Sequence, residues 1–289
     1  MNEQRIAIIT DSGTDVPSTF ASEHDVRVVP LRINYSDGSS FQSGVDITSD
    51  EVIRRFGQEI PKTSLPSPQQ VLSALEGARA DGYVAAVIVT ISAGLSATNQ
   101  TCRLVAGQME DFPVTVVDSK SIGLMAGMVV QRAVELVESG VPFSLLDSRL
   151  RRCARETSVF FAVKSLEYLY RGGRINGTVY RLGNALNIKP VLMCDDAGYY
   201  VVARKARGWN KALDTMVSLC SQQANQFARS RVGICCSSNT SELFDRLEER
   251  LRAAIPGLVE VQRSGISPDL LVHTGPDLVG MGAQAVEVG

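Results

Sequence analysis

The sequence predicts an α/β protein of two domains, and three observations lead to this prediction. The chain has 289 residues, which is long for one compact core and comfortable for two. Its first half alternates apolar strands with amphipathic helices, the spacing of a mostly parallel sheet with helices on both faces. Its second half mixes hairpins with helices, which is typical of an α+β domain. We therefore expect an N-terminal α/β domain over 1–155 and a C-terminal α+β domain over 156–289.

The expected elements of the first half follow one another in βαβ order. Arg5–Thr10 is an unbroken apolar run, the pattern of a strand covered on both faces. The segments expected after it are a short helix from Pro17, a strand over 26–33, a turn over 35–38, a helix capped by Thr48 or Ser49, a proline-rich break over 61–68, a helix over 69–80, a strand over 83–91, a helix over 99–110, a strand over 114–117 and a helix over 123–139.

The second half differs because its strands pair locally. The run over 187–193, a turn over 195–198 and the run over 199–203 predict a hairpin. The other expected segments are a strand over 158–163, a short helix over 165–169, a helix over 209–228, a strand over 231–236, a helix over 239–254 and an edge strand over 259–263.

Composition and charge exclude several classes of protein. Hydrophobic residues make up 44% and the net charge is −2, so neither disorder nor a nucleic-acid partner is expected. No apolar run reaches the roughly 20 residues that span a bilayer, so no stable membrane insertion is expected. The N-terminus lacks the pattern of a signal peptide, and we expect a cytoplasmic protein. The six cysteines lack metal-ligand spacing, so no metal site is expected.

Hydroxyl-rich segments follow three strands of the expected parallel sheet. They lie at 10–12, 92–98 and 118–119, and Thr63 and Ser64 add two more hydroxyls. The carboxyl ends of parallel strands share one edge of a sheet, where α/β folds bind ligands. Such side chains also serve as N-caps of the helices that follow. Both interpretations of these hydroxyl residues, a polar pocket and a set of helix N-caps, remain open.

The sequence offers little for catalysis. No GxxxxGK[ST] occurs, no GxGxxG opens the first helix and GxSxG is absent, so we expect no nucleotide cofactor and no serine hydrolase. Binding is the better interpretation. Arg171 and Arg174 flank two glycines and fit an anion or an acidic partner, or else a helix C-terminus. His273 lies in an expected polar turn, either as a hydrogen-bond donor to an anion or as a loop residue.

Seven ordered motifs resemble those of the DegV family of bacterial fatty-acid-binding proteins, over essentially the whole chain. The motifs are IAIITDSGTDVP (6–17), PKTSLPSP (61–68), TISAGLSATNQT (90–101), VTVVDSKSIG (114–123), LEYLYRGGRING (166–177), LNIKPVL (186–192) and HTGPDLVG (273–280). The resemblance implies a two-domain carrier, not an enzyme, that buries a long-chain fatty acid. It also implies a separate kinase that phosphorylates the presented carboxylate.

The resemblance further implies which residues hold the carboxylate. The hydroxyls are those of Thr63 and Ser96, with Ser92 near the start of the same loop. From the residues themselves, Ser64, Arg174 and His273 are candidates for an accessory role. Two positions depart from the family pattern: Ala93 stands where a serine is frequent, and Ala97 where a glycine is frequent. A second hypothesis is an enzyme that acts on a small carboxylate-containing metabolite at the same pocket, with Asp11 or His273 as the acid–base group.

Overall fold

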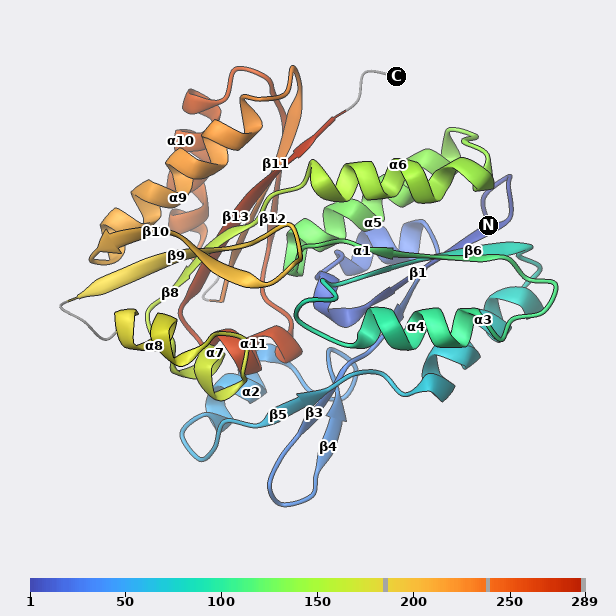
Figure 1. Cartoon of the computed structure of the whole chain (residues 1–289), viewed down its shortest axis with the longest axis horizontal. Helices are drawn as coiled ribbons and strands as arrows, with labels where there is room; N and C mark the ends of the chain where they lie inside the picture. The colour runs from blue at the N-terminus through green and yellow to red at the C-terminus, as the bar shows by residue number, and fades with distance from the viewer. Residues whose placement is uncertain (184–186, 238–239, 287–289) are drawn as a thin grey trace.

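The N-terminal half is built on a four-stranded parallel sheet. The computed structural model describes residues 1–183, 187–237 and 240–286, and Figure 1 shows the whole chain. The strands are β1 (Ile6–Asp11), β2 (Val26–Val29), β6 (Ala85–Thr90) and β7 (Val114–Asp118), in the order β2-β1-β6-β7. All three pairings are parallel, which confirms the mostly parallel sheet that the sequence predicts.

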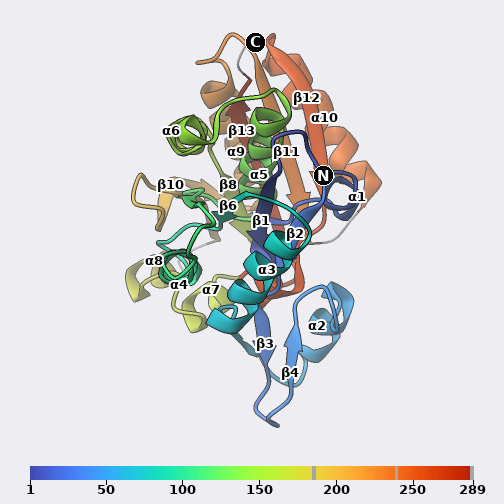
Figure 2. The same ribbon diagram turned by 90° about the vertical axis from the view of Figure 1, so that its right-hand side faces the viewer.

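Helices cover both faces of this sheet, as the unbroken apolar strands require. On one face α3 (Pro68–Ala80) and α4 (Thr98–Ala106) bury Leu75 and Cys102 against the strands. On the other face lie α1 (Ser18–Glu23), α5 (Gly123–Glu138) and α6 (Phe143–Arg155), whose apolar side chains form a second core. Figures 1 and 2 show the two layers on opposite sides of the sheet. The helix α6 was not predicted.

The C-terminal half contains a six-stranded mixed sheet in the order β10-β9-β8-β13-β11-β12. Its strands are β8 (Phe160–Val163), β9 (Ile188–Cys194), β10 (Tyr200–Arg207), β11 (Ser230–Cys236), β12 (Leu258–Ser264) and β13 (Leu278–Ala285). The helices α9 (Trp209–Ala224) and α10 (Ser241–Ala254) pack on one face. The α+β architecture, the hairpin β9–β10 and the edge position of β12 are confirmed. The predicted starts of a helix at 239 and of a motif at 186 lie outside the described residues.

A small antiparallel sheet, β4-β3-β5, was not predicted. It consists of β3 (Arg32–Asn34), β4 (Ser40–Gln42) and β5 (Lys62–Ser64), next to the capped helix α2 (Ser49–Arg55). The prediction of one strand over 26–33 is wrong. Pro30 has no N–H for a ladder, and the chain leaves the parallel sheet after Val29 and joins the small sheet at Arg32. The proline-rich segment 61–68, predicted as a break, supplies β5.

Three short helices lie between the small sheet and the six-stranded sheet (Figure 1). They are α7 (Glu167–Arg171), α8 (Gly177–Gly183) and α11 (Pro268–Thr274). The predicted polar turn at His273 is wrong: His273 and Thr274 close the last turn of α11, and the turn to β13 comes at Gly275, whose φ is 72°. A helix end holds a side chain more firmly than a loop does.

The helix α5 belongs to the cores of both halves. Thirteen of its residues are buried, and it packs against β1 and β6 of the first sheet and against β11 and β13 of the second. All strands of the parallel sheet precede residue 119, and all strands of the mixed sheet follow residue 159. The domain boundary at 155/156 stays a prediction. Within the described ranges, no helix is both long and apolar enough to cross a bilayer.

Candidate functional site

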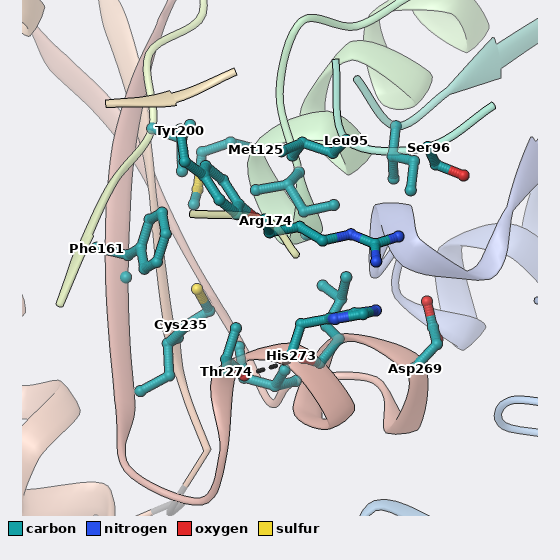
Figure 3. Close-up of a pocket in the computed structure, with 18 of the residues that line it drawn as sticks. Leu95, Ser96, Met125, Phe161, Arg174, Tyr200, Cys235, Asp269, His273 and Thr274 are labelled. Atoms are coloured by element: carbon teal, nitrogen blue, oxygen red, sulfur yellow. Dashed lines mark hydrogen bonds between the residues drawn. The ribbon is translucent and has the colours of Figure 1, made fainter. Parts of the chain in front are cut away.

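A largely apolar cavity lies where the two halves meet. The space free of atoms within it is about 680 Å³, which includes the part that is open to solvent. Figure 3 shows side chains from both halves around it. The apolar side chains of the lining are Leu31, Ile91, Leu95, Ile122, Met125, Val159, Phe161, Ile266, Leu270 and Leu278. Such a wall suits a hydrocarbon group.

One end of the cavity is closed by aromatic side chains. Phe161 of β8 and Tyr200 of β10 meet edge to face, with 4.8 Å between their ring centroids. Cys235 of β11 lies beside them (Figure 3). Burial raises the pKa values of the Cys235 thiol and the Tyr200 phenol well above their ordinary range. Both groups are therefore neutral at physiological pH, and this end of the cavity carries no charge.

The polar side chains gather at the other end. In Figure 3 the guanidinium of Arg174, the imidazole of His273 and the hydroxyl of Ser96 lie away from Phe161 and Tyr200. Thr63 of β5 lines the same cavity, and its Oγ1 lies 2.7 Å from Nε2 of His273. Four of the residues predicted from the sequence are thus brought together, although β5 and α11 are 210 positions apart along the chain.

Arg174 is a half-buried cation that has no acidic partner in the part of the chain that the structure describes. Its Nη1 donates to the carbonyl oxygen of Gly172 at 2.5 Å, and no carboxylate of the described residues lies within ion-pair distance. Burial lowers the pKa of Arg174, but a guanidinium stays protonated in proteins. A desolvated cation of this kind is stabilised by an anionic ligand.

The glycines beside Arg174 end the helix α7 and shape the site. Gly173, with a φ of 74°, takes the left-handed position of a Schellman motif, in which Gly173 N–H donates to Tyr170 and Arg174 N–H to Leu169. Arg171 points outward and pairs with Glu167 at 2.6 Å. The helix-end interpretation therefore holds for this segment, and in addition the motif directs Arg174 to the cavity.

His273 is neutral across the physiological pH range. Burial lowers its pKa to about 3, and the nearby Arg174 contributes to the shift. A Cβ at Gly172 would collide with Nδ1 of His273, so the glycine permits the close packing of α7 on α11. Nδ1 is buried and has no hydrogen-bond partner among the described residues. A proton there would be a buried donor without an acceptor, which favours the tautomer protonated at Nε2.

A more open depression adjoins the polar end of the cavity. The two share Leu31, Thr63, Leu95, Ser96 and Arg174, and the depression is also lined by Ser64 and Arg103. Ser64 is exposed and accepts a hydrogen bond from Asn34 at 3.1 Å. The polar end therefore opens toward the surface, whereas the aromatic end is closed.

Ser92 lies apart from both the cavity and the adjoining depression. Its side chain is fully buried, and its hydroxyl donates to the carbonyl oxygen of Gly198 at 2.8 Å. It is not among the residues that line the cavity or the adjoining depression. The segment 118–121 is likewise set back, since Ser119 and Ser121 are buried and only Ile122 and Gly123 after it reach the cavity wall.

Three buried carboxyl groups lie beneath the cavity. Asp11 and Asp15 flank the turn after β1, and Asp269 in α11 accepts hydrogen bonds from the hydroxyls of Ser12 and Ser43. Desolvation by burial raises the pKa of Asp11 to about 7 and raises those of Asp15 and Asp269 as well. Of the three, Asp269 alone reaches the cavity wall. Among the residues that the structure describes, no group of His, Cys, Asp and Glu could hold a metal ion.

Fold and cavity together define a two-domain α/β protein with a binding cavity between its halves, closed and apolar at one end, open and cationic at the other. The chain belongs to the DegV family. A family model described as "Uncharacterised protein, DegV family" matches residues 5–286. A DegV domain-containing protein of Clostridium acetobutylicum is 31% identical over 282 residues, which cover 96% of this chain and 98% of the relative.

Solved structures of the family share the fold. A DegV family protein from Thermus thermophilus, described as fatty-acid-binding, superposes with a TM-score of 0.89 at 32% identity, over 98% of this chain and 100% of that one. A protein from Eubacterium ventriosum described as stearic-acid-binding gives a TM-score of 0.86 at 26% identity, over 99% and 98% of the two chains.

Sequence reasoning missed the wall of the cavity. Phe161, Tyr200 and Cys235 were assigned to strands but not to a site, because alternation within a strand does not say which face meets another domain. Asp269 was not singled out either. A carboxyl group at the second position of a helix is an ordinary feature of helix N-termini, so no local signal marks it.

Proposed function

We propose that this protein binds a long-chain fatty acid and carries it without transforming it. The carboxylate lies at the polar end, in contact with Thr63, Ser96 and Arg174, and the acyl chain runs toward Phe161 and Tyr200. The observation that carries the proposal is Arg174, a half-buried cation with no carboxylate partner among the described residues, placed at the open end of a closed apolar cavity.

The apolar wall accounts for affinity. Burying a methylene group contributes about 0.8 kcal/mol, so a chain of roughly 14 to 16 carbons gains on the order of 10 kcal/mol before the cost of association. The ionised head group loses several kcal/mol of hydration unless donors replace the water. Arg174 and the hydroxyls of Thr63 and Ser96 supply those donors, so the polar end determines that the ligand is an acid.

His273 prepares Thr63 for this role. With the proton on Nε2, the imidazole donates to Oγ1 of Thr63. The hydroxyl proton of Thr63 is then free to point at a carboxylate oxygen. The low pKa of His273 keeps this arrangement unchanged across the physiological pH range.

The relatives support the same class of ligand. The Thermus thermophilus protein is described as fatty-acid-binding and the Eubacterium ventriosum protein as stearic-acid-binding. Both exceed 25% identity and span nearly all of this chain. The proposal includes a cytoplasmic location, which the free cysteines of the described residues would suit.

We further propose that a separate kinase phosphorylates the bound carboxylate. The polar end opens to the depression that contains Ser64 and Arg103, and the exposed Arg171 on the neighbouring helix offers a cation to an acidic partner surface. The variant Arg171→Gln should keep its affinity for fatty acid but form acyl phosphate more slowly with the kinase, with a weaker dependence on salt. An unchanged rate of acyl-phosphate formation would contradict the docking role of Arg171 and leave it a structural role in the ion pair with Glu167.

Native mass spectrometry tests the carrier function against the enzyme hypothesis. A carrier should retain one long-chain acid through purification, and the delipidated protein should bind added acid more tightly than the matching alcohol. A protein that stays empty with every long-chain acid would contradict the proposal. Asp11 has the pKa that proton transfer needs, but its oxygens accept hydrogen bonds from Gly13 N–H and Ile91 N–H, away from the cavity.

A further inference from the structure

The turn of the β9–β10 hairpin docks onto the loop that carries Ser96. The turn comprises residues 195–198 of the C-terminal half, and the loop comprises residues 92–98 of the N-terminal half. Ser92 Oγ donates to the carbonyl oxygen of Gly198 at 2.8 Å and also accepts from Gly94 N–H at 3.1 Å. One buried hydroxyl thus orders its own loop and holds the hairpin.

Two glycines let the turn and the loop approach closely. A Cβ on Gly94 would lie 2.6 Å from the carbonyl carbon of Gly198, and a Cβ on Gly198 would collide with the Ser92 hydroxyl. Gly198 also has a φ of 87°, which disfavours any other residue. At Gly94 the contact is therefore backbone against backbone, and at Gly198 the Ser92 hydroxyl lies directly against the backbone of the turn.

The loop that follows β7 supports the same contact. Asp118 at the end of β7 accepts hydrogen bonds from the backbone N–H groups of Ala93 and Lys120 through Oδ1. Lys120 pairs with Asp118 at 3.1 Å and reaches the carbonyl oxygen of Ala197 at 3.4 Å. We call the contacts of Ser92, Gly94 and Lys120 with residues 197–198 the interdomain clasp.

The clasp connects the two ends of the cavity. Four positions after Ser92, the loop presents Ser96 at the polar end, and two positions after Gly198, strand β10 presents Tyr200 at the aromatic end. The strand β10 is an edge strand, held on one side only by β9. While the turn is hydrogen-bonded to the loop, the edge hairpin closes the wall of the cavity. When these contacts break, the hairpin can move away and the wall opens.

We propose that Ser92 is a positioning residue that keeps the cavity closed over the acyl chain and thereby sets the rate of fatty-acid release. This inference rests on the proposed function and assigns Ser92 to the interdomain clasp instead of the carboxylate. Loss of one buried hydrogen bond corresponds to roughly a 3- to 10-fold change in an equilibrium. We expect this change to fall on the dissociation rate, since the open state is the one that releases ligand.

The test compares Ser92→Ala with Ser96→Ala, using palmitic acid and hexadecanol as probes in stopped-flow displacement. For Ser92→Ala, the dissociation rates of the acid and the alcohol should rise by the same factor, because the clasp does not touch the head group. For Ser96→Ala, the acid alone should be affected. A loss in Ser92→Ala that is confined to the acid would overturn the proposal and return Ser92 to the carboxylate.

Hydrogen exchange supplies a readout that does not depend on ligand. The amide hydrogens of residues 197–200 should exchange faster in Ser92→Ala, whereas Tyr199→Ala, a change of an exposed side chain on the same hairpin, should leave exchange and release unchanged. If Ser92→Ala does not fold, Lys120→Met weakens the outer contact and should give a smaller effect of the same kind. Normal exchange and release in both clasp variants would refute the clasp. A parent protein that binds acid and alcohol equally would instead refute the proposed function.

Discussion

At the scale of single residues, the hydroxyl of Thr63 is expected to distinguish an acid from an alcohol. Thr63→Val keeps the shape of the side chain and removes a donor to a charged group, a loss of roughly 1.5–3 kcal/mol. Affinity for palmitic acid should therefore fall roughly 10- to 100-fold while affinity for hexadecanol changes little. Calorimetric titration of the delipidated protein measures both. Equal affinities in parent and variant would place the head group elsewhere in the cavity.

Asp11 gives the stability of the protein a defined pH dependence. Its pKa is raised to about 7 in the folded chain, whereas an unfolded aspartate has a pKa near 4. The folded state therefore binds this proton more tightly, and the stabilisation is fully present below about pH 4 and is lost as the pH rises through 7. The expected decline is about 1 kcal/mol per pH unit within that window. Asp15 and Asp269, whose pKa values are also raised, contribute with the same sign.

Urea denaturation across this window tests the role of Asp11. The variant Asp11→Asn should show a shallower decline in the free energy of unfolding than the parent. Asp37→Asn is the control. Hydrogen bonds with Ser39 lower the pKa of the exposed Asp37, so this group makes the folded state more stable, not less, as the pH rises. An equally steep decline in Asp11→Asn would assign the pH dependence to other groups.

At the scale of elements, the end of α7 provides a matched pair of glycines. A Cβ at Gly172 would collide with Nδ1 of His273, whereas a Cβ at Gly173 meets nothing within 4 Å. Gly172→Ala should therefore push α7 from α11, displace His273 and abolish most fatty-acid binding. Gly173→Ala, at a φ of 74°, should cost about 1 kcal/mol of stability through backbone strain and keep binding. Thermal unfolding and titration of both variants separate the effects, and similar binding by the two would contradict the packing argument.

Elements with strong local signals could be predicted from the sequence, and the short ones could not. The buried strands over Ile6–Asp11 and Ala85–Thr90 are apolar throughout, so each stands out alone. The small sheet consists of strands of three residues, which are too short for any periodicity. Its position depends on Pro30 and on packing with α11, and neither is visible as a pattern.

The polar half of the site could be predicted and the apolar half could not. The family resemblance indicated Thr63 and Ser96, the place of Arg174 and His273 beside glycines drew attention to these two, and all four do line one cavity. The apolar wall is made of ordinary core residues. Which of them border a cavity is decided by how the two halves pack, and the lining residues come from positions as far apart along the chain as Leu31 and Leu278.

At the scale of the whole molecule, the chain is expected to hold the acid but not to activate it. The sequence has no Walker A phosphate-binding loop and no dinucleotide fingerprint. Incubation with ATP, Mg²⁺ and palmitic acid should therefore give no acyl phosphate, and addition of a fatty acid kinase should give it. Trapping with hydroxylamine, followed by mass spectrometry, detects the product. Formation of acyl phosphate by the isolated chain would overturn the carrier function.

The position of β13 has a consequence for how the protein is made in the cell. The helix α5 is complete at Glu138, but β13, which packs against it, ends at Ala285 and lies in the middle of its sheet, between β8 and β11. Ribosomes add about 5 to 20 residues per second, so the face of α5 that packs on the second sheet waits roughly 7 to 30 s for this strand. During this interval that apolar face lacks one of its two strands of the mixed sheet, so we expect the C-terminal half to complete its core only after the last strand has emerged.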